Sequence, residues 1–513
     1  MKPFVNEPIN LFSDPEDRKG MEKAIAEAES NLGREYHLII DGKREKAPDQ
    51  FMSHNPSDPD EVVGAFQRGT VEQAEKAIQA ALKAFESWSR TPAEERAEYC
   101  FKIAEIIRRR RFELNAWMIL ETGKSWIEAD ADVAEAIDLI DYYGREALRY
   151  AGEQPLEKIP SERNELLYIP LGVGIVIPPW NFPLAILGGM TAAAFVSGNT
   201  VVLKPSSDAP MMSKLFMSIL EEAGLPPGVV NLLTGPGGEV GDFLVSHPKT
   251  RFISFTGSKE VGLRINERAA RAEPGQIWIK RVICEMGGKD PIIVDDEADL
   301  DFALKPVVGS AYGFGGQKCS ACSRLILVNS IYDEFLERVV DAVKKLRVGL
   351  AKDPDTFMGP VINLKAVATI SDYIDMGKRE GKLLCGGNRL DMKGYFIEPT
   401  VFGDVDRKAT IAQEEIFGPV LSVIRAADFN DAINIANDSE YGLTGSLFTK
   451  NRDKMKIARE RFHLGNLYFN RKCTGALVDV EPFGGFNMSG TDSKAGGRDY
   501  LMLFLQGKSI TER

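Results

Sequence analysis

Histidine is scarce in this chain, and the four that occur stand far apart, at positions 37, 54, 247 and 463. Zinc sites in proteins need several His or Cys ligands at short spacings, so the sequence predicts no metal centre. With so few imidazoles, any acid or base used in catalysis is expected to be a carboxylate. The six cysteines are scattered over 513 residues, which is typical of reduced thiols in a cytoplasmic protein rather than of a disulfide framework.

Long apolar runs are also missing. The first twenty residues, MKPFVNEPINLFSDPEDRKG, contain no apolar core of a secretory signal. The most apolar stretch, 184–202, is interrupted by Gly, Ser, Thr and Asn and indicates a buried helix followed by a strand, so no membrane span is expected. The net charge of −12 repels phosphate backbones, which argues against a nucleic-acid partner.

What the chain does contain is an alternation of short β-rich runs and helical stretches. Residues 55–143 have a mostly helical pattern after an extended entry. Beyond residue 166, β-rich runs at 173–177, 200–203, 229–232 and 252–255 are followed by helical stretches that begin near Ala185, Met211, Glu239 and Lys259. A second alternating block runs from 291–294 through 325–328 to about residue 448. Such alternation predicts an α/β fold with mostly parallel sheets.

At 513 residues the chain exceeds the size at which one hydrophobic core stops growing, so at least two domains are expected. A boundary is predicted near residues 284–288. The apolar run close to the C-terminus should form a strand, and a neighbouring subunit is a reasonable pairing partner for it.

Five segments carry a resemblance: IPPWNFPLAI (177–186), ISFTGSKEVG (253–262), CEMGGKDPIIV (284–294), FGGQKCSACSR (314–324) and EEIFGPV (414–420). In their order and spacing they resemble the aldehyde dehydrogenase superfamily over essentially the whole chain. The resemblance implies a Rossmann-like dinucleotide-binding domain from 1–147 and 169–284, and an α/β catalytic domain from 285–485. It also implies a small β oligomerisation element from 148–168 and 486–513, and hence a homo-oligomer.

The chemistry of such an enzyme requires a thiolate nucleophile, donors for an oxyanion, and a base that activates water against a thioester. By resemblance, Cys319 is the nucleophile, Asn181 with the Cys319 backbone N–H forms the oxyanion site, and Glu285 is the base. Read alone, Cys319 and Cys322 could also be a redox or metal C-x-x-C pair, although no second cluster completes a metal site. Under oxidation the two thiols could form a disulfide that silences the enzyme.

The phosphate-binding fingerprint G-x-G-x-x-G is absent, and GPGGEVG (235–241) has the wrong spacing. The family lacks it as well, and the resemblance places NAD against a helix that begins after FTGS. Ser207 stands where relatives with a strong preference for NAD carry Glu, so some tolerance of NADP is expected. The implied cofactor site comprises Ile177, Pro179, Trp180, Lys204, Ser207, Gly237, Gly241, Phe255, Gly257, Ser258, Val261, Met286, Gly287, Glu415 and Phe417.

The segment GNLYFNRKCTGALVDVEPFGGFNMSGTDSKAGG (465–497) is more particular. It resembles the branch of the family that oxidises L-glutamate γ-semialdehyde, the open form of Δ1-pyrroline-5-carboxylate, to L-glutamate in proline and arginine breakdown. A substrate with an α-carboxylate needs fixed donors, which backbone N–H groups of a loop at 473–477 can supply. The implied substrate residues are Glu135, Phe182, Lys318, Ser320, Gly475, Ala476 and Phe483. Rival interpretations are an enzyme for another small acidic or amino aldehyde, a CoA-acylating member, and a binding protein without turnover.

Overall fold

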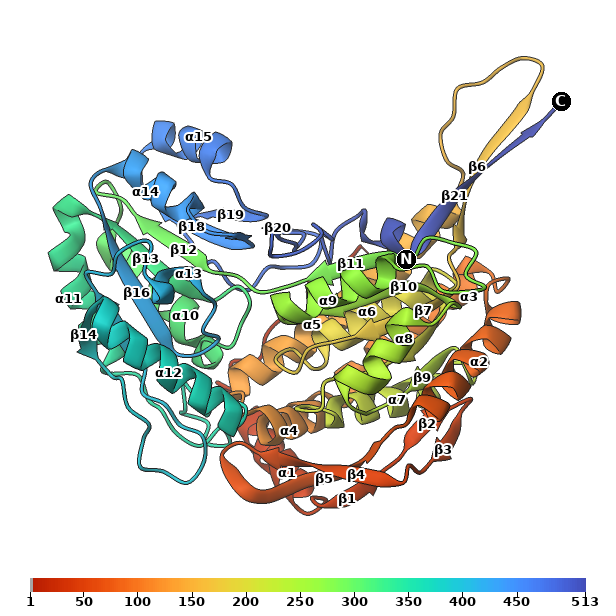
Figure 1. Cartoon of the computed structure of the whole chain (residues 1–513), viewed down its shortest axis with the longest axis horizontal. Coiled ribbons are helices and arrows are strands. Elements are labelled where there is room, and N and C mark those ends of the chain that lie inside the picture. The colour runs from red at the N-terminus through yellow and green to blue at the C-terminus, as the bar shows by residue number, and fades with distance from the viewer. Residues whose placement is uncertain (1–2) are drawn as a thin grey trace.

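The computed structural model describes residues 3–513, so the first two residues of the expected 1–147 segment and of the N-terminal stretch lie outside it. Two seven-stranded sheets organise the chain, each covered by helices and each with its own buried apolar core (Figure 1). Five strands of the first sheet are parallel, and so are six of the second. This is the α/β architecture that the alternating sequence pattern predicts.

The first sheet runs in the order β11-β10-β7-β8-β9-β2-β3. Its strands are β11 (Arg281–Glu285), β10 (Thr250–Thr256), β7 (Val173–Ile177), β8 (Thr200–Leu203), β9 (Val230–Leu232), β2 (Leu38–Ile40) and β3 (Lys43–Glu45). The helices between and around them are α2 (Val71–Trp88), α3 (Ala93–Arg109), α4 (Arg111–Thr122), α5 (Trp126–Ala151), α6 (Ala185–Val196), α7 (Met211–Ala223), α8 (Asp242–Ser246) and α9 (Lys259–Ala270). Strands β7 and β8, and the starts of α6, α7 and α9, coincide with the predicted positions.

The second sheet runs in the order β14-β15-β16-β13-β12-β18-β19. Its strands are β14 (Lys382–Cys385), β15 (Thr400–Gly403), β16 (Val420–Ala426), β13 (Cys322–Val328), β12 (Asp290–Val294), β18 (Thr444–Phe448) and β19 (Asn466–Phe469). Its helices are α10 (Leu300–Tyr312), α11 (Tyr332–Val343), α12 (Leu364–Glu380), α13 (Thr410–Gln413), α14 (Phe429–Asn437) and α15 (Arg452–Arg461). The chain crosses from β11 of the first sheet to β12 of the second through residues 286–289 only, which brings the two sheets together at this point.

Two features extend or correct the sequence prediction. The extended entry predicted before the helices of 55–143 is part of a sheet, because β4 (Asp49–Asn55) and the eleven-residue β5 (Asp58–Arg68) pair with each other and β1 (Arg34–Tyr36) pairs with β5. The C-terminal strand β21 (Leu505–Glu512) pairs along its full length with β6 (Arg163–Pro170) of the same chain, where the sequence favoured a neighbouring subunit. These two strands project from the body as a narrow arm (Figure 1).

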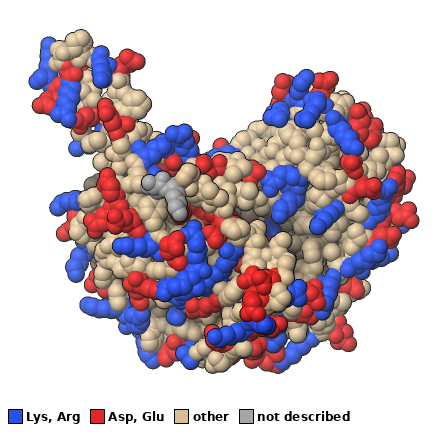
Figure 2. Space-filling view, turned by 180° about the vertical axis from the view of Figure 1, so that it is seen from behind, with Lys and Arg blue, Asp and Glu red and all other residues tan. Residues whose placement is uncertain are grey.

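The surface carries both signs of charge. Figure 2 shows Lys and Arg interspersed with Asp and Glu over one face, without a large field of one sign. Within residues 3–513, no helix combines the length and the apolarity needed to cross a bilayer.

Candidate active site

The predicted nucleophile lies on a loop whose backbone turns sharply between α10 and β13. Helix α10 ends before Gly313, and the next three residues, Phe314, Gly315 and Gly316, have φ values of 52°, 63° and 69°. A side chain at Gly316 would lie 2.4 Å from the carbonyl oxygen of Gly418, so only glycine fits this close approach. The turn places Cys319 half-buried just before β13. Burial, followed by the charges of Asp290 and Glu415, raises the pKa of its thiol well above the ordinary value.

Asn181, the predicted oxyanion donor, is bonded directly to the nucleophile loop. Its side chain is buried, and its amide Nδ2 donates to the carbonyl oxygen of Gln317 at 3.0 Å, two residues before Cys319. Gln317 is itself fully buried and accepts from the backbone N–H of Ile362 at 2.9 Å. The loops that carry Asn181 and Cys319 are therefore fixed to each other through buried amides.

Glu285, the predicted base, ends the edge strand β11 and is covered by the C-terminal loop. Its carboxylate accepts the Ser493 hydroxyl at 2.6 Å, the Ser493 backbone N–H at 3.2 Å and the Gly485 N–H at 3.4 Å. Burial raises the pKa of Glu285 to about 7 in spite of these donors. No salt bridge reaches this carboxylate within residues 3–513. Lys494, the nearby cation, donates its ammonium to the carbonyl oxygens of Gly465 and Gly484.

An ion pair joins Asp132 of helix α5 to Lys124, which lies just before that helix and close to the nucleophile loop. Lys124 and Asp132 form a fully buried salt bridge at 2.7 Å, and Asp132 also accepts the Ala185 N–H at 2.7 Å, where α6 begins. The Lys124 ammonium lies 4.0 Å from the ring centroid of Phe182 and 5.0 Å from that of Phe314. This one ion pair thus contacts the segments that carry Asn181 and Cys319.

Of the predicted substrate residues, Phe182, Lys318 and Glu135 lie near this pair. Lys318 forms an ion pair with Glu128 at 2.6 Å, and this contact holds the pKa of Glu128 below its ordinary value although burial opposes the shift. Glu135 is half-buried, and burial together with the charge of Asp132 raises its pKa to about 8. The carbonyl oxygen of buried Ser320 accepts the Cys473 thiol at 3.3 Å, which ties the nucleophile loop to the 473–477 loop. Phe483 forms an antiparallel backbone bridge with Ala495.

The predicted cofactor residues line the carboxyl ends of the first sheet. Ser258 caps α9 by accepting the Val261 N–H at 3.5 Å. Lys204 is buried, its pKa is lowered to about 8 by burial, and its ammonium makes one bond, to the carbonyl oxygen of Pro205 at 3.2 Å. A side chain at Gly241 would lie 3.6 Å from the Lys204 side chain, which brings these two predicted residues together.

Glu415 and Phe417 approach the same edge from the second sheet. The Glu415 carboxylate accepts the Gly288 N–H at 3.1 Å, and a Cβ at Gly287 would overlap it at 2.1 Å. The ring of Phe417 lies 5.6 Å from that of Trp180, at the end of β7. Exposed Ser207 follows Lys204, and Gly237 and Gly241 bound a helical turn over residues 237–241. The remaining cofactor residues, Ile177, Pro179, Phe255, Gly257 and Met286, follow or end strands β7, β10 and β11.

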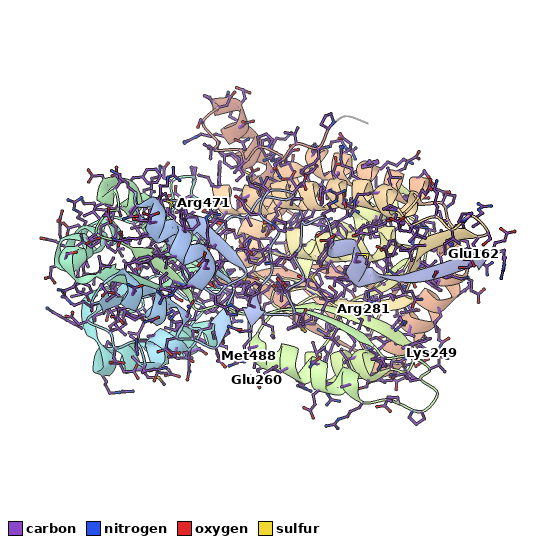
Figure 3. All side chains as sticks on the ribbon, turned by 90° about the horizontal axis from the view of Figure 1, so that it is seen from above. Glu162, Lys249, Glu260, Arg281, Arg471 and Met488 are labelled. Atoms are coloured by element: carbon purple, nitrogen blue, oxygen red, sulfur yellow. The ribbon has the colours of Figure 1, made fainter. Side chains whose placement is uncertain are left out.

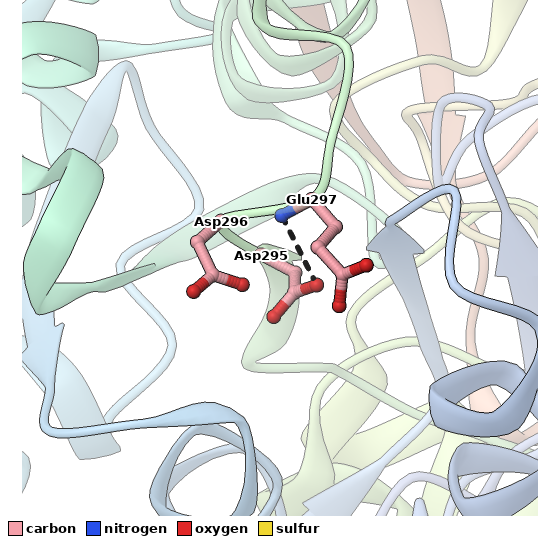
Figure 4. A group of neighbouring side chains, drawn as sticks. All are labelled: Asp295, Asp296 and Glu297. Carbon is pink, nitrogen blue, oxygen red and sulfur yellow. Dashed lines mark hydrogen bonds between the residues drawn. The ribbon is translucent and has the colours of Figure 1, made fainter.

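The acidic group Asp295, Asp296 and Glu297 has the spacing of metal ligands (Figure 4). The Lys454 ammonium lies 2.8, 2.9 and 3.0 Å from their respective carboxylates, so a cation of the chain itself already contacts all three. The group follows β12 at its carboxyl end, whereas Cys319 precedes the amino end of the parallel neighbour β13. The acidic group and Cys319 therefore lie at opposite ends of the parallel strands of the second sheet.

Three residues of this region were missed by sequence reasoning: Lys124, Asp132 and Ser493. A signal existed for Asp132, because helix α5 buries three aspartates, Asp130, Asp132 and Asp138, among its apolar residues. Buried carboxylates in a helix are rarely left without a partner. No comparable signal marks Ser493, which reaches Glu285 across 208 residues of sequence.

A model of the aldehyde dehydrogenase family matches residues 43–510, and the chain belongs to this family. Among curated proteins it is 55% identical to a 1-pyrroline-5-carboxylate dehydrogenase of Geobacillus kaustophilus over 512 residues, covering 100% of this chain and 99% of the relative. Among solved structures it superposes on 1-pyrroline-5-carboxylate dehydrogenase from Thermus with bound NAD at a TM-score of 0.99, with 52% identity and coverage of 100% and 99%. Betaine aldehyde dehydrogenase of Staphylococcus aureus in complex with NAD+ is similar at a TM-score of 0.90, with 35% identity and coverage of 96% and 97%.

Proposed function

We propose that this chain oxidises L-glutamate γ-semialdehyde, the open form of Δ1-pyrroline-5-carboxylate, to L-glutamate with NAD, as part of proline and arginine breakdown. The relatives with more than half of their residues identical bear the name of this activity, and the Thermus structure contains NAD. The observation that carries the chemistry is the convergence of Cys319, Asn181 and Glu285 where the two sheets meet, with the pKa of Glu285 close to neutral.

In the proposed mechanism, the Cys319 thiol loses its proton to water and the sulfur attacks the aldehyde carbon, and the oxygen that becomes negative is stabilised by Asn181 and the Cys319 backbone N–H. Asn181 uses one amide hydrogen on Gln317, which leaves the second for the oxyanion. Bound NAD accepts the hydride that leaves this carbon, which produces a thioester on Cys319. Glu285 then takes a proton from water as the water attacks the thioester, and L-glutamate is released.

The residues present fit the cofactor. Lys204 is a buried ammonium with a single hydrogen bond and so retains donors for a ribose hydroxyl. The Glu415 carboxylate packs against Gly287, which has no side chain, and accepts the Gly288 N–H with one oxygen, so it keeps acceptor sites for the hydroxyls of a ribose. The N-terminal N–H groups of α9 suit a pyrophosphate. Ser207 neither repels nor pairs with a 2′-phosphate, so NAD is the preferred cofactor with some tolerance of NADP.

The domain roles follow the same proposal. Residues 1–147 and 169–284 bind NAD, residues 285–485 carry the nucleophile, and residues 148–168 with 486–513 form an oligomerisation element. Leu156, Ile159 and Leu167, in or beside the projecting β6–β21 arm, are exposed apolar side chains. Such side chains on a projecting ribbon are suited to contact a second copy of the chain, so a homo-oligomer is proposed.

The test is NADH formation with Δ1-pyrroline-5-carboxylate, succinic semialdehyde and propanal as alternative substrates. A site built around the α-carboxylate should favour the first by about a hundredfold or more in kcat/KM. Equal activity on propanal would contradict the proposed substrate but would agree with the proposed aldehyde oxidation. Replacing NAD by NADP in the same assay tests the cofactor preference, and complete rejection of NADP would contradict the tolerance expected from Ser207.

A further inference from the structure

The 473–477 loop is held by the side chain of Arg471. Arg471 follows β19 and directs its guanidinium back onto the loop, where Nη2 donates to the carbonyl oxygens of Gly475 at 2.9 Å and Thr474 at 3.4 Å. The guanidinium carbon lies 4.4 Å from the ring centroid of Tyr468, so the side chain is stacked as well as bonded. In Figure 3, Arg471 lies on the lobe of β18 and β19 where that lobe meets the rest of the chain.

Glu481 completes the same contact from the far end of the loop. Its carboxylate pairs with Nη1 of Arg471 and accepts the Leu477 N–H at 2.9 Å, while its own N–H donates to the Leu477 carbonyl oxygen at 2.9 Å. Both side chains are largely shielded from water, with 30% and 23% of their surfaces exposed. The pair thus connects residues 474, 475 and 477 to one charge-neutral unit.

These contacts determine where the loop's N–H groups point. In a trans peptide, the carbonyl oxygen and the following N–H lie on opposite sides of the chain. Because Arg471 binds the carbonyl oxygens of Thr474 and Gly475, the N–H groups of Gly475 and Ala476 face away from it. Within residues 3–513, neither of these two N–H groups donates a hydrogen bond, and Gly475 has the positive φ of 72° that the turn requires.

We propose that Arg471 and Glu481 are positioning residues that aim the Gly475 and Ala476 N–H groups at the substrate α-carboxylate. They act on specificity rather than on chemistry, since their contacts are with the backbone of the loop. The inference rests on the proposed function, because it assumes that this carboxylate is what the two N–H groups bind.

The test compares two substrates in the full-length protein with NAD. Arg471→Met removes the donors while keeping bulk. Loss of hydrogen bonds from a charged group should lower kcat/KM for Δ1-pyrroline-5-carboxylate ten- to a hundredfold, roughly, mainly through KM. The kcat/KM for propanal, which has no carboxylate, should stay within about threefold. The Ki of L-glutamate should rise with the KM, and Arg471→Lys should recover part of the loss.

Two further variants separate positioning from other roles. If Arg471 attracted the substrate by its charge, Glu481→Ala would expose that charge and lower the KM; positioning predicts that it raises the KM. Arg459→Met is the matched control, because Arg459 stacks at 5.1 Å on Phe469 of the same strand without a bond to the loop. It should leave both substrates unchanged.

The outcomes are distinct. Two results with Arg471→Met would overturn the positioning role: equal losses of kcat/KM on both substrates at an unchanged melting temperature, or no loss on either substrate. A wild-type enzyme without preference for Δ1-pyrroline-5-carboxylate would remove the proposed function and this inference together. A preferring wild type with an unaffected Arg471→Met would remove the inference alone.

Discussion

Two buried carboxylates flank the proposed nucleophile in opposite electrostatic surroundings. Asp132 is fully buried against the ammonium of Lys124, and the pair also caps α6. Glu285 is nearly as buried but receives only the hydroxyl and backbone N–H of Ser493 and the N–H of Gly485. Burial raises the pKa of both carboxyls. The contacting cation Lys124 opposes the shift at Asp132, whereas at Glu285 the hydrogen bonds from Ser493 and Gly485 oppose it more than the charge of Lys494 does.

The two carboxylates are therefore expected to have different roles: Asp132 holds neighbouring segments in place, whereas Glu285 accepts and releases a proton. A buried ion pair fixes the segments that it contacts, because removing either partner leaves the other buried without a partner. A carboxyl with a pKa near 7 is close to evenly protonated at neutral pH, which is the condition for a general base. The stability of the fold and the turnover of the enzyme should therefore respond to different residues at one site.

Glu285→Gln should give the largest effect, and on turnover alone. Removing a general base lowers steady-state NADH production by roughly two to four orders of magnitude, while a burst of one NADH per site survives, since hydride transfer precedes hydrolysis. Stopped-flow absorbance separates the two phases. Cys319→Ala is the control, because it should abolish both burst and steady state. An unchanged steady state in Glu285→Gln would refute the role of base.

The free energy of unfolding of Glu285→Gln tests the same contrast between Glu285 and Asp132. The folded pKa of Glu285 lies above its ordinary 4.5, at about 7. Its stabilisation is therefore complete below pH 4.5 and is lost as the pH rises through 7, an amount of about 3 kcal/mol for this shift. Glutamine resembles the protonated form, so the free energy of unfolding of Glu285→Gln at pH 8 should not fall below that of the wild type.

Lys124→Met should have the opposite effect to Glu285→Gln: a large loss of stability at the Asp132 ion pair. It leaves Asp132 buried without its cation, and breaking a buried pair typically costs about 3–5 kcal/mol of stability. Chemical denaturation should show this loss, and Lys124→Met combined with Asp132→Asn should recover part of it. Lys76→Met is the matched control, because the partner of Lys76, Glu45 at 3.2 Å, is reached at the surface, where a pair is worth at most about 1 kcal/mol. Equal losses from the two lysine variants would contradict the role of the buried pair.

The pH dependence of turnover should follow the unpaired carboxylate. Where hydrolysis limits turnover, kcat rises about tenfold per pH unit below 7 and levels off above it, as Glu285 loses its proton. Burial also raises the pKa of Glu415 to about 7, so this group titrates in the same range. The residual activity of Glu285→Gln reports the contribution of Glu415. A profile of the same shape in that variant would assign the titration to another group.

The sequence alone predicted much of the framework, for physical reasons. Strands β7 and β8 and the starts of α6, α7 and α9 are marked by turn residues beside compact apolar runs, which local rules recognise. Strand β5 was predicted only as part of an extended entry and not as a member of a sheet, because its burial comes from pairing with β4. Pairing of this kind is decided by tertiary contacts rather than by local propensity.

The site shows the same division. Cys319, Glu285 and Asn181 stand in short distinctive motifs, so a resemblance could nominate them. Ser493 and Arg471 act through contacts that only the fold creates. Ser493 meets Glu285 across 208 residues, and Arg471 acts by directing peptide groups rather than by presenting a side chain to the pocket. No spacing rule identifies such residues.

Ser493→Ala should give the smallest effect and the most direct measure of how the base is tuned. The Ser493 hydroxyl bond to Glu285, at 2.6 Å, is the largest of the contacts that lower the pKa of this carboxyl. A hydrogen bond to a charged group is worth about 1.5–3 kcal/mol, so its loss should move the pKa of Glu285 upward by one unit or more. Turnover should then fall several-fold at pH 7 and recover near pH 9. The control is Ser489→Ala, a buried serine of the same loop whose hydroxyl accepts the Gly442 N–H instead. A loss of equal size at every pH in Ser493→Ala would mean that the hydroxyl only holds the loop, and the contrast between a tuned base and a fixed ion pair would no longer stand.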